Sequence, residues 1–206
     1  MSQNNKIFYD KFYTHNHHES WEEAPGKRVV LDFIQTLSAP TSVLDIGCGS
    51  GYFLREIHKL HASLDLLMGI DISAVAIEKA ESLYDYSFFS TPIENFEYIK
   101  KFDLIVSYGV FEHLEDPGKA ITKIKENLSP GGHFALLMPT LGHYRTDRKD
   151  EGFYEDLNIP PQLQWHWPRS KWESLFEDNN LSLFDCDLVS QFGAQKCANF
   201  YFGTNR

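Results

Sequence analysis

The sequence predicts an α/β fold built on a doubly wound, mostly parallel sheet, and three observations predict it. Apolar runs typical of buried strands alternate with amphipathic segments typical of helices between residues 42 and 139. The first strand leads into the glycine-rich turn of VLDIGCGSGYF, residues 43–53. The second strand, LDLLMGID, ends in an aspartate. A glycine turn between strand and helix, followed by an acidic strand end, is typical of nucleotide-binding α/β sheets.

The elements follow one another with few ambiguities. A helix is expected over 26–37, where apolar residues recur at helical spacing, and Pro40 closes it. Further helices are expected over 52–60, 73–83 with Ser73 as N-cap, 92–99, 116–128 with Pro117 in the first turn, and 169–180. Strands are expected over 42–47, 64–71, 86–90, 102–108, 133–139, 181–189 and 197–203, with a turn at SPGG, residues 129–132.

Two segments lack a clear period. Residues 1–23 are polar and aromatic, and residues 140–167 combine charges, prolines and aromatic rings. Long connections of this kind tend to be functional. We therefore expect one domain over residues 1–206, with a lid at 1–23 and a substrate-covering insertion at 140–167.

Composition narrows the class of protein. The chain has 206 residues, 42% of them hydrophobic, and a formal net charge of −10. This size and composition suit one globular domain, and the acidic balance disfavours a nucleic-acid or anionic membrane surface. No apolar stretch approaches the roughly 20 residues of a membrane helix. Three cysteines without metal spacing, Cys48, Cys186 and Cys197, suggest reduced thiols and a cytoplasmic protein.

The glycine turn differs from a dinucleotide fingerprint in two ways. Tyr52 stands where G-x-G-x-x-G requires its third glycine, and Asp45 precedes the first glycine by two residues. A carboxylate beside a pyrophosphate is repelled, whereas a carboxylate beside a cation is attracted. S-adenosylmethionine carries a sulfonium and an ammonium against one carboxylate, so it suits Asp45. Asp71 can accept hydrogen bonds from both hydroxyls of a ribose, whichever nucleoside is bound.

Four motifs in order, VLDIGCGSGYF, GIDIS, FDLIVSYGVFEHLEDP and LSPGGHFALLMP, resemble the class I S-adenosylmethionine-dependent methyltransferases. The resemblance is strongest over residues 42–139. Within the family, the chain is similar to the small-molecule branch that includes ubiquinone-biosynthesis-type O-methyltransferases. It implies a Rossmann-like seven-stranded sheet whose last strand, CANFYFG, is antiparallel. It also implies methyl transfer to an oxygen or nitrogen of a small acceptor by in-line displacement, with S-adenosylhomocysteine as co-product.

The resemblance also implies roles for individual residues. The methionine part of the cofactor would be surrounded by Asp45, Gly47 and Gly49, in a loop supported by Cys48 and Gly51. Asp71 would hold the ribose, with Ile72, Pro92, Ile93 and Glu94 beside the adenine. Ser107, Tyr108 and Gly109 would face the methyl donor, and Tyr13 would belong to an aromatic lid over the cofactor, because ring faces attract sulfonium-like cations.

Catalytic groups are less sharply indicated. If the acceptor needs a general base, the candidates are His113, His143 and His166. Glu112 and His113 could form an acid–base pair, or His113 could simply pack near the site. The ubiquinone-type branch associates E-x-x-E-H with a divalent metal, but Gly109 replaces the first glutamate here, so no metal is expected. In the insertion, Arg145 and Arg148 could bind an anionic group of the acceptor.

Two other classes of function stay open at this point. The chain could be a non-catalytic cofactor-binding or partner protein of the same fold, because binding and catalysis share one loop. It could also be an NAD-dependent oxidoreductase, which Asp45 and Tyr52 disfavour. The sequence does not indicate an oligomeric state.

Overall fold

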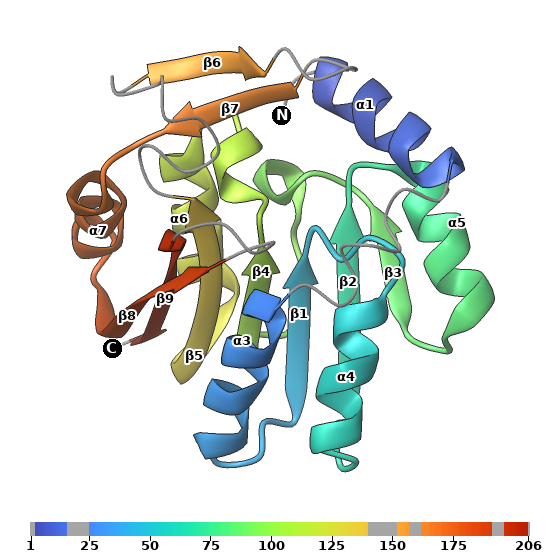
Figure 1. Ribbon diagram of the computed structural model, residues 1–206. Helices are drawn as coiled ribbons and strands as arrows, with labels where there is room; N and C mark the ends of the chain where they lie inside the picture. Colours follow the sequence, from blue (N-terminus) through green and yellow to red (C-terminus); the bar gives the residue numbers. More distant parts are fainter. Residues whose placement is uncertain (1–2, 16–24, 140–151, 157–161, 191–195, 206) are drawn as a thin grey trace.

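A seven-stranded sheet forms the centre of the computed structural model, which describes residues 3–15, 25–139, 152–156, 162–190 and 196–205 (Figure 1). The sheet order is β3-β2-β1-β4-β5-β9-β8. Its strands are β1 (Ser42–Ile46), β2 (Leu66–Asp71), β3 (Ser87–Ser90), β4 (Phe102–Tyr108), β5 (Leu128–Pro139), β8 (Leu181–Ser190) and β9 (Lys196–Asn205). The first five pair in parallel, and β9 runs antiparallel to both β5 and β8. The predicted sheet, with its antiparallel last strand, is confirmed.

Helices cover both faces of the sheet because the strand residues alternate in side. Val43 packs on one face with α3 (Pro25–Thr36), α4 (Tyr52–Leu60) and α5 (Ala74–Leu83). Leu44 packs on the other face with α6 (Pro117–Asn127) and α7 (Arg169–Asp178). The strands are therefore buried on both sides, which explains why they read as apolar runs in the sequence.

Two expected helix starts are confirmed in detail. The Ser73 hydroxyl accepts a hydrogen bond from the Ala76 amide at 3.2 Å and caps α5. Pro117 begins α6, and the Asp116 carboxylate accepts from the Lys119 amide at 2.9 Å. Both caps use amides that the helix itself leaves unpaired.

Three local expectations need correction. Residues 129–132 were expected as a separate turn, but they lie within β5, where the register with β4 shifts and Gly131 takes a φ of 74°. The helix expected over 92–99 is a single turn, η1 (Ile93–Asn95). Part of the insertion, where the sequence shows no clear period, forms the hairpin of β6 (Gly152–Asp156) and β7 (Gln162–His166). The remainder of residues 140–161 lies outside the described parts.

The N-terminal segment contains a helix that its weak periodicity did not predict. Helix α1 (Gln3–Thr14) lies over the carboxyl ends of the parallel strands and contacts α5 and β7 (Figure 1). Ligands of open α/β sheets bind at this edge. The helix therefore covers the place where the sequence predicts a site. None of the described helices is long and apolar enough to cross a bilayer.

Candidate functional site

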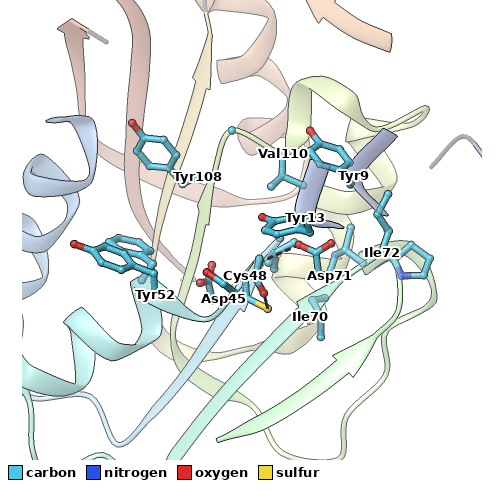
Figure 2. Close-up of a pocket in the computed structure, with 18 of the residues that line it drawn as sticks. Tyr9, Tyr13, Asp45, Cys48, Tyr52, Ile70, Asp71, Ile72, Tyr108 and Val110 are labelled. Carbon is cyan, nitrogen blue, oxygen red and sulfur yellow. Dashed lines mark hydrogen bonds between the residues drawn. The ribbon is translucent and has the colours of Figure 1, made fainter. Parts of the chain in front are cut away.

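A hollow, partly open to solvent, lies at the carboxyl ends of β1, β2 and β4 (Figure 2). The glycine turn forms its floor, and α1 covers it. Of the residues predicted to bind the cofactor, eleven line it: Tyr13, Asp45, Gly47, Cys48, Gly49, Asp71, Ile72, Pro92, Ile93, Tyr108 and Gly109. Segments from five separate parts of the chain therefore meet in one cavity, as the motif order implied.

The glycine turn has a backbone shape that other residues rarely adopt. Gly47 and Gly49 have φ of 75° and 55°. A Cβ on Gly47 would overlap the Val110 side chain, and one on Gly49 would overlap the Tyr13 hydroxyl. Both the conformation and the space therefore require glycine. The bare backbone therefore allows the side chains of Val110 and Tyr13 to pack directly against the turn.

Asp71 ties the turn to the second strand. Its carboxylate accepts hydrogen bonds from the Gly49 amide at 3.0 Å and from the Ser73 amide at 2.9 Å. Each carboxylate oxygen can accept a further hydrogen bond. Asp71 therefore fixes the loop and keeps acceptor capacity toward the hollow that it lines.

Two buried carboxylates give the floor of the hollow its electrostatic character. Burial raises the pKa of Asp45 to about 7, against the attraction of Lys27 and helped by the charge of Asp71. Burial also raises the pKa of Asp71 to about 6, although backbone amides of Ser73, Gly49 and Ile72 donate to it and oppose the rise. A ligand cation placed here would stabilise both ionised forms and lower both pKa values.

Apolar residues line the side of the hollow next to β2 and β3. Ile72 follows β2 directly, and Pro92 and Ile93 begin η1 after β3. The Thr91 amide donates to the Asp71 carbonyl at 2.8 Å, which holds the two strand ends together. A flat apolar slot beside a hydrogen-bond acceptor suits a nucleobase joined to a ribose.

Helix α1 contributes aromatic rings to the roof. Tyr9, Phe12 and Tyr13 line the hollow, and Tyr13 lies above Cys48 and Asp71 in Figure 2. Burial, with the nearby charge of Asp71, raises the pKa of the Tyr13 hydroxyl well above its usual value. Tyr13 is therefore a neutral hydrogen-bonding group at physiological pH.

Polar contacts hold α1 in this position. The side-chain amide of Asn5, which is buried, donates to the His113 carbonyl at 2.8 Å. The Ser73 hydroxyl donates to the Asp10 carboxylate at 2.6 Å. These contacts join α1 to segments that follow β4 and β2. The roof is therefore attached to both sides of the hollow.

Three residues of the predicted cofactor site are not among the described residues that line the hollow. The Ser107 hydroxyl donates to the Ile46 carbonyl at 2.8 Å and joins β4 to β1. Gly51, with a φ of 81°, precedes α4 and packs against Phe88. Glu94 lies half-buried in η1. These positions suit residues that support the lining of the hollow rather than residues that contact a ligand.

The candidate bases are spread more widely. His113 is buried in the turn η2 (Phe111–His113), and its Nε2 lies 3.6 Å from Glu112 Oε1. Burial raises the pKa of Glu112 to about 8, so this acid holds its proton at neutral pH. His113 is not among the described residues that line the hollow. His143 lies outside the described residues, as does the side chain of His166 at the end of β7.

Sequence reasoning did not pick out Lys27 and Tyr52 as lining residues, although both face the hollow. Lys27 comes from α3, which precedes the first motif, and no spacing rule connects it to the glycine turn. A lysine in the first turn of a helix is electrostatically disfavoured, because the helix N-terminus already carries partial positive charge. This disfavoured position is the signal that could have drawn attention to Lys27. Tyr52 was considered only as the residue that breaks the dinucleotide fingerprint.

Comparison with known proteins identifies relatives of this arrangement. Residues 13–185 match a family model described as a methyltransferase domain. The chain is 31% identical over 137 residues to a malonyl-[acyl-carrier protein] O-methyltransferase of Anoxybacillus flavithermus, covering 65% of this chain and 48% of that protein. It is 34% identical over 100 residues to a ubiquinone biosynthesis O-methyltransferase of Nitrobacter winogradskyi, covering 45% and 36%. The chain thus spans about half, or less, of the length of these curated relatives.

A solved structure shares the fold. It is the Burkholderia thailandensis 1,6-didemethyltoxoflavin-N1-methyltransferase, with 1,6-didemethyltoxoflavin and S-adenosylhomocysteine bound to that protein. The TM-score is 0.76 at 16% identity, over 97% of this chain and 87% of the other. The likeness extends through α1 and the closing strands as well as the central motifs.

Proposed function

Because the chain belongs to the methyltransferase-domain family, we propose that it transfers a methyl group from S-adenosylmethionine to an oxygen or nitrogen of a small-molecule acceptor. One observation carries the proposal. The glycine turn, two buried carboxylates and an apolar slot meet in a single hollow beneath α1. Each part of this hollow matches a part of that cofactor.

The residues present fit the cofactor on chemical grounds. The turn around Gly47 and Gly49 has no room for a Cβ but exposes backbone to the hollow. Asp45 offers a carboxylate to cationic groups, and Asp71 offers acceptor oxygens to ribose hydroxyls. A pyrophosphate beside the buried carboxylate of Asp45 would be repelled, which disfavours the oxidoreductase alternative.

When bound, S-adenosylmethionine supplies an electrophilic methyl group attached to a good leaving group. The chain's own task is therefore mainly to position two molecules and exclude water. Asp45 and Asp71 orient the cofactor, Ile72, Pro92 and Ile93 receive its base, and α1 covers the site. The open side near Tyr108 and Gly109 would admit the acceptor.

A general base is needed only if the acceptor enters protonated on its reacting atom. His113 lies behind the lining, next to Tyr9, with their ring centroids 6.1 Å apart. Its burial favours a positioning role through Tyr9 over direct proton transfer. His143 and His166 belong to the proposed substrate-covering insertion and stay candidates for the base.

The partner that the site suits is a small molecule. The hollow is enclosed from above by α1, and the formal net charge of −10 disfavours a nucleic acid. Residues 1–206 are proposed to act as one domain, with α1 as its lid. A non-catalytic protein of the same fold would share all of these features, so only a measurement of turnover distinguishes the two functions.

The test is turnover with a panel of small acceptors, measured as S-adenosylhomocysteine formed per protein. An acceptor-dependent signal above the acceptor-free rate supports the proposal, and Asp45→Asn should abolish most of it. Arg28→Met, a change on the exposed face of α3, should leave the rate unchanged. Tight cofactor binding without turnover for any acceptor class would instead support a non-catalytic role.

A further inference from the structure

One buried carboxyl group next to the hollow has an oxygen atom without a partner. Glu112 follows β4 in the turn η2, and its side chain is only 6% exposed. Its Oε2 is buried and has no hydrogen-bond partner among the described residues. Its Oε1 lies 3.6 Å from His113 Nε2, which is too long for a hydrogen bond. A buried polar atom in this state is costly and points to a ligand or a function.

The glycine that follows β4 leaves a gap beside this carboxyl group. Gly109 lines the hollow and has a φ of 68°. Among the described atoms outside Gly109 and its two chain neighbours, only Glu112 Oε1 lies within 4 Å of the place where a Gly109 Cβ would stand, at 3.4 Å. A ligand atom in that place would therefore touch the carboxyl group. Glu112 itself is not among the described residues that line the hollow, so this gap is the approach to it.

The gap lies apart from the region that suits the nucleoside. Asp71 ends β2, and Ile72 follows it directly. Gly109 instead follows β4. In Figure 2 its chain neighbours Tyr108 and Val110 lie apart from Ile72. A nucleoside bound at the end of β2 therefore leaves the gap at Gly109 to a second molecule, on the side where the acceptor is proposed to enter.

The carboxyl group of Glu112 also lacks a compensating cation. Burial raises its pKa to about 8, opposed only by a hydrogen bond from its own backbone, and no lysine or arginine of the described residues contributes. At neutral pH Glu112 therefore keeps its proton. A ligand cation beside it would favour the ionised carboxylate and supply the missing opposite charge.

An aromatic ring lies close to the same place. Tyr9 lines the hollow, and its ring centroid lies 6.1 Å from that of His113, the residue after Glu112. A tyrosine face and a carboxylate both attract an ammonium group. The like charge of Lys27 lies 5.2 Å from the ring centroid of Tyr52, and Figure 2 shows Tyr52 and Tyr9 on opposite sides of the hollow. The surroundings of Glu112 therefore suit a cation.

We propose that Glu112 binds an amino group of the acceptor through the gap at Gly109, so that the acceptor is a primary or secondary amine. This inference rests on the proposed methyltransferase function and narrows its acceptor class. The amine would enter as an ammonium cation and donate a charge-assisted hydrogen bond to the Glu112 carboxylate. The proton that Glu112 carries at neutral pH would pass to solvent as this pair forms. The formal net charge of −10 favours the approach of such a cation.

The experiment compares three probes of similar shape and different charge: benzylamine, benzyl alcohol and benzoate. Their affinities for the complete chain, saturated with S-adenosylhomocysteine, are measured at pH 7 by ligand-observed NMR. We expect benzylamine to bind about tenfold more tightly than benzyl alcohol, because its hydrogen bond to Glu112 is charge-assisted. Benzoate should bind most weakly, because it brings a second acid to the same place.

Variants assign the preference to the residue. Glu112→Gln keeps the shape of the side chain but removes its charge, and it should bind benzylamine and benzyl alcohol equally. Glu115→Gln, at an exposed position three residues further along the chain, is the matched control and should keep the wild-type preference. Both variants should bind S-adenosylhomocysteine as the wild type does, which shows that they are folded.

Infrared difference spectroscopy observes the carboxyl group of Glu112 directly. Adding benzylamine to the wild type at pH 7 should remove the band of one protonated carboxyl group, because the cation ionises Glu112. Benzyl alcohol should leave that band in place. In Glu112→Gln, benzylamine should remove no such band. A merely structural role of Glu112 would give the same spectrum with both probes.

Two results would overturn the inference. One is a wild-type protein that binds benzylamine no more tightly than benzyl alcohol, including one that binds neither, or a preference that persists in Glu112→Gln. The other is a preference for benzylamine that requires added Mg²⁺ and disappears with EDTA, since that would assign Glu112 to a metal ion. Failure of the proposed function is a different result, namely a wild-type protein that does not bind S-adenosylhomocysteine.

Discussion

Two buried carboxylates, Asp45 and Asp71, determine what the floor of the hollow can bind. Each stands at the carboxyl end of a parallel strand, and burial raises the pKa of each. A protein tolerates buried acids where a function or a partner compensates them. In this chain a cationic, ribose-bearing ligand would supply that compensation.

Replacing Asp71 should weaken cofactor binding. Asp71→Ala removes the acceptor proposed for the ribose hydroxyls and also releases the Gly49 amide. The loss should be about 1.5–3 kcal/mol in binding of S-adenosylhomocysteine, measured by calorimetry. Asp85→Ala, at an exposed position outside the hollow, is the matched control. Equal affinities for Asp71→Ala and wild type would refute this role.

Cofactor affinity should depend on pH through Asp45. Its pKa in the folded, ligand-free protein is about 7, and the cofactor's positive charge favours the ionised carboxylate. Affinity for S-adenosylmethionine should therefore rise about tenfold between pH 5.5 and 8. Asp45→Asn should bind more weakly and lose most of this slope. A slope that is the same in both proteins would contradict the assignment.

The stability of the ligand-free protein should change with pH in the opposite sense. Between pH values of about 4 and 7, the folded state keeps a proton on Asp45 that the unfolded state has released. The free energy of unfolding should therefore fall as pH rises through this window, and Asp45→Asn should reduce that fall. Urea denaturation at several pH values measures it. A wild-type stability that rises more steeply than that of Asp45→Asn would show the sign to be wrong.

At the scale of elements, the difference between what the sequence predicted and what it missed has a physical basis. The strands of the large sheet were predicted because strands buried on both faces read as apolar runs. The helices α3 to α7 were predicted because an apolar stripe at helical spacing matches one packed face. Helix α1 was missed because its aromatic residues do not form one continuous apolar stripe. Tyr9, Phe12 and Tyr13 line the hollow, and the ring of Phe8 packs against those of Tyr9 and Phe12. The hairpin of β6 and β7 was missed because each strand is only five residues long and β6, GFYED, does not alternate.

The same reasoning explains which residues of the candidate site could be predicted from the sequence. Asp45, Gly47, Gly49 and Asp71 could be predicted because their roles depend on local backbone geometry at strand ends. Lys27 could not, because its place in the hollow results from the packing of α3 against the sheet. Glu94 and Ser107 were expected beside the cofactor, but neither is among the described residues that line the hollow.

Helix α1 is predicted to act as a lid whose closure depends on the cofactor. S-adenosylhomocysteine should protect residues 8–21 from chymotrypsin, because Tyr9 and Tyr13 close over the hollow. Asn5→Ala removes the buried contact with the His113 carbonyl and should reduce that protection severalfold. Lys11→Ala, at an exposed position of the same helix, serves as control. Equal cleavage with and without the ligand would argue against closure.

At the scale of the whole molecule, one sheet separates two hydrophobic cores, and one of its edges forms the candidate binding site. Helices α3, α4 and α5 close one core, and α6 and α7 close the other. All loops that line the hollow leave the same edge of the sheet. The position of each loop therefore depends on the correct order of the strands, including β9 between β5 and β8.

The packing of β9 should be sensitive to added volume. A Cβ on Gly203 would overlap the Ser182 carbonyl oxygen and the ring of Phe134. Gly203→Ala should lower the free energy of unfolding by about 1–3 kcal/mol, measured by urea denaturation. Gly118→Ala, in the first turn of α6, meets no atom closer than 3.3 Å and should be neutral or slightly stabilising. If both variants matched in stability, this account of the β9 contact would be incorrect.

The most direct test of the central claim is calorimetric titration of the purified protein with S-adenosylhomocysteine, with NAD titrated in parallel. The account predicts micromolar binding of the first and no binding of the second, because the carboxylate of Asp45 beside the glycine turn attracts the ammonium group of S-adenosylhomocysteine and repels a pyrophosphate. Binding of NAD alone would contradict the electrostatic role of Asp45. It would indicate that the glycine turn binds a dinucleotide.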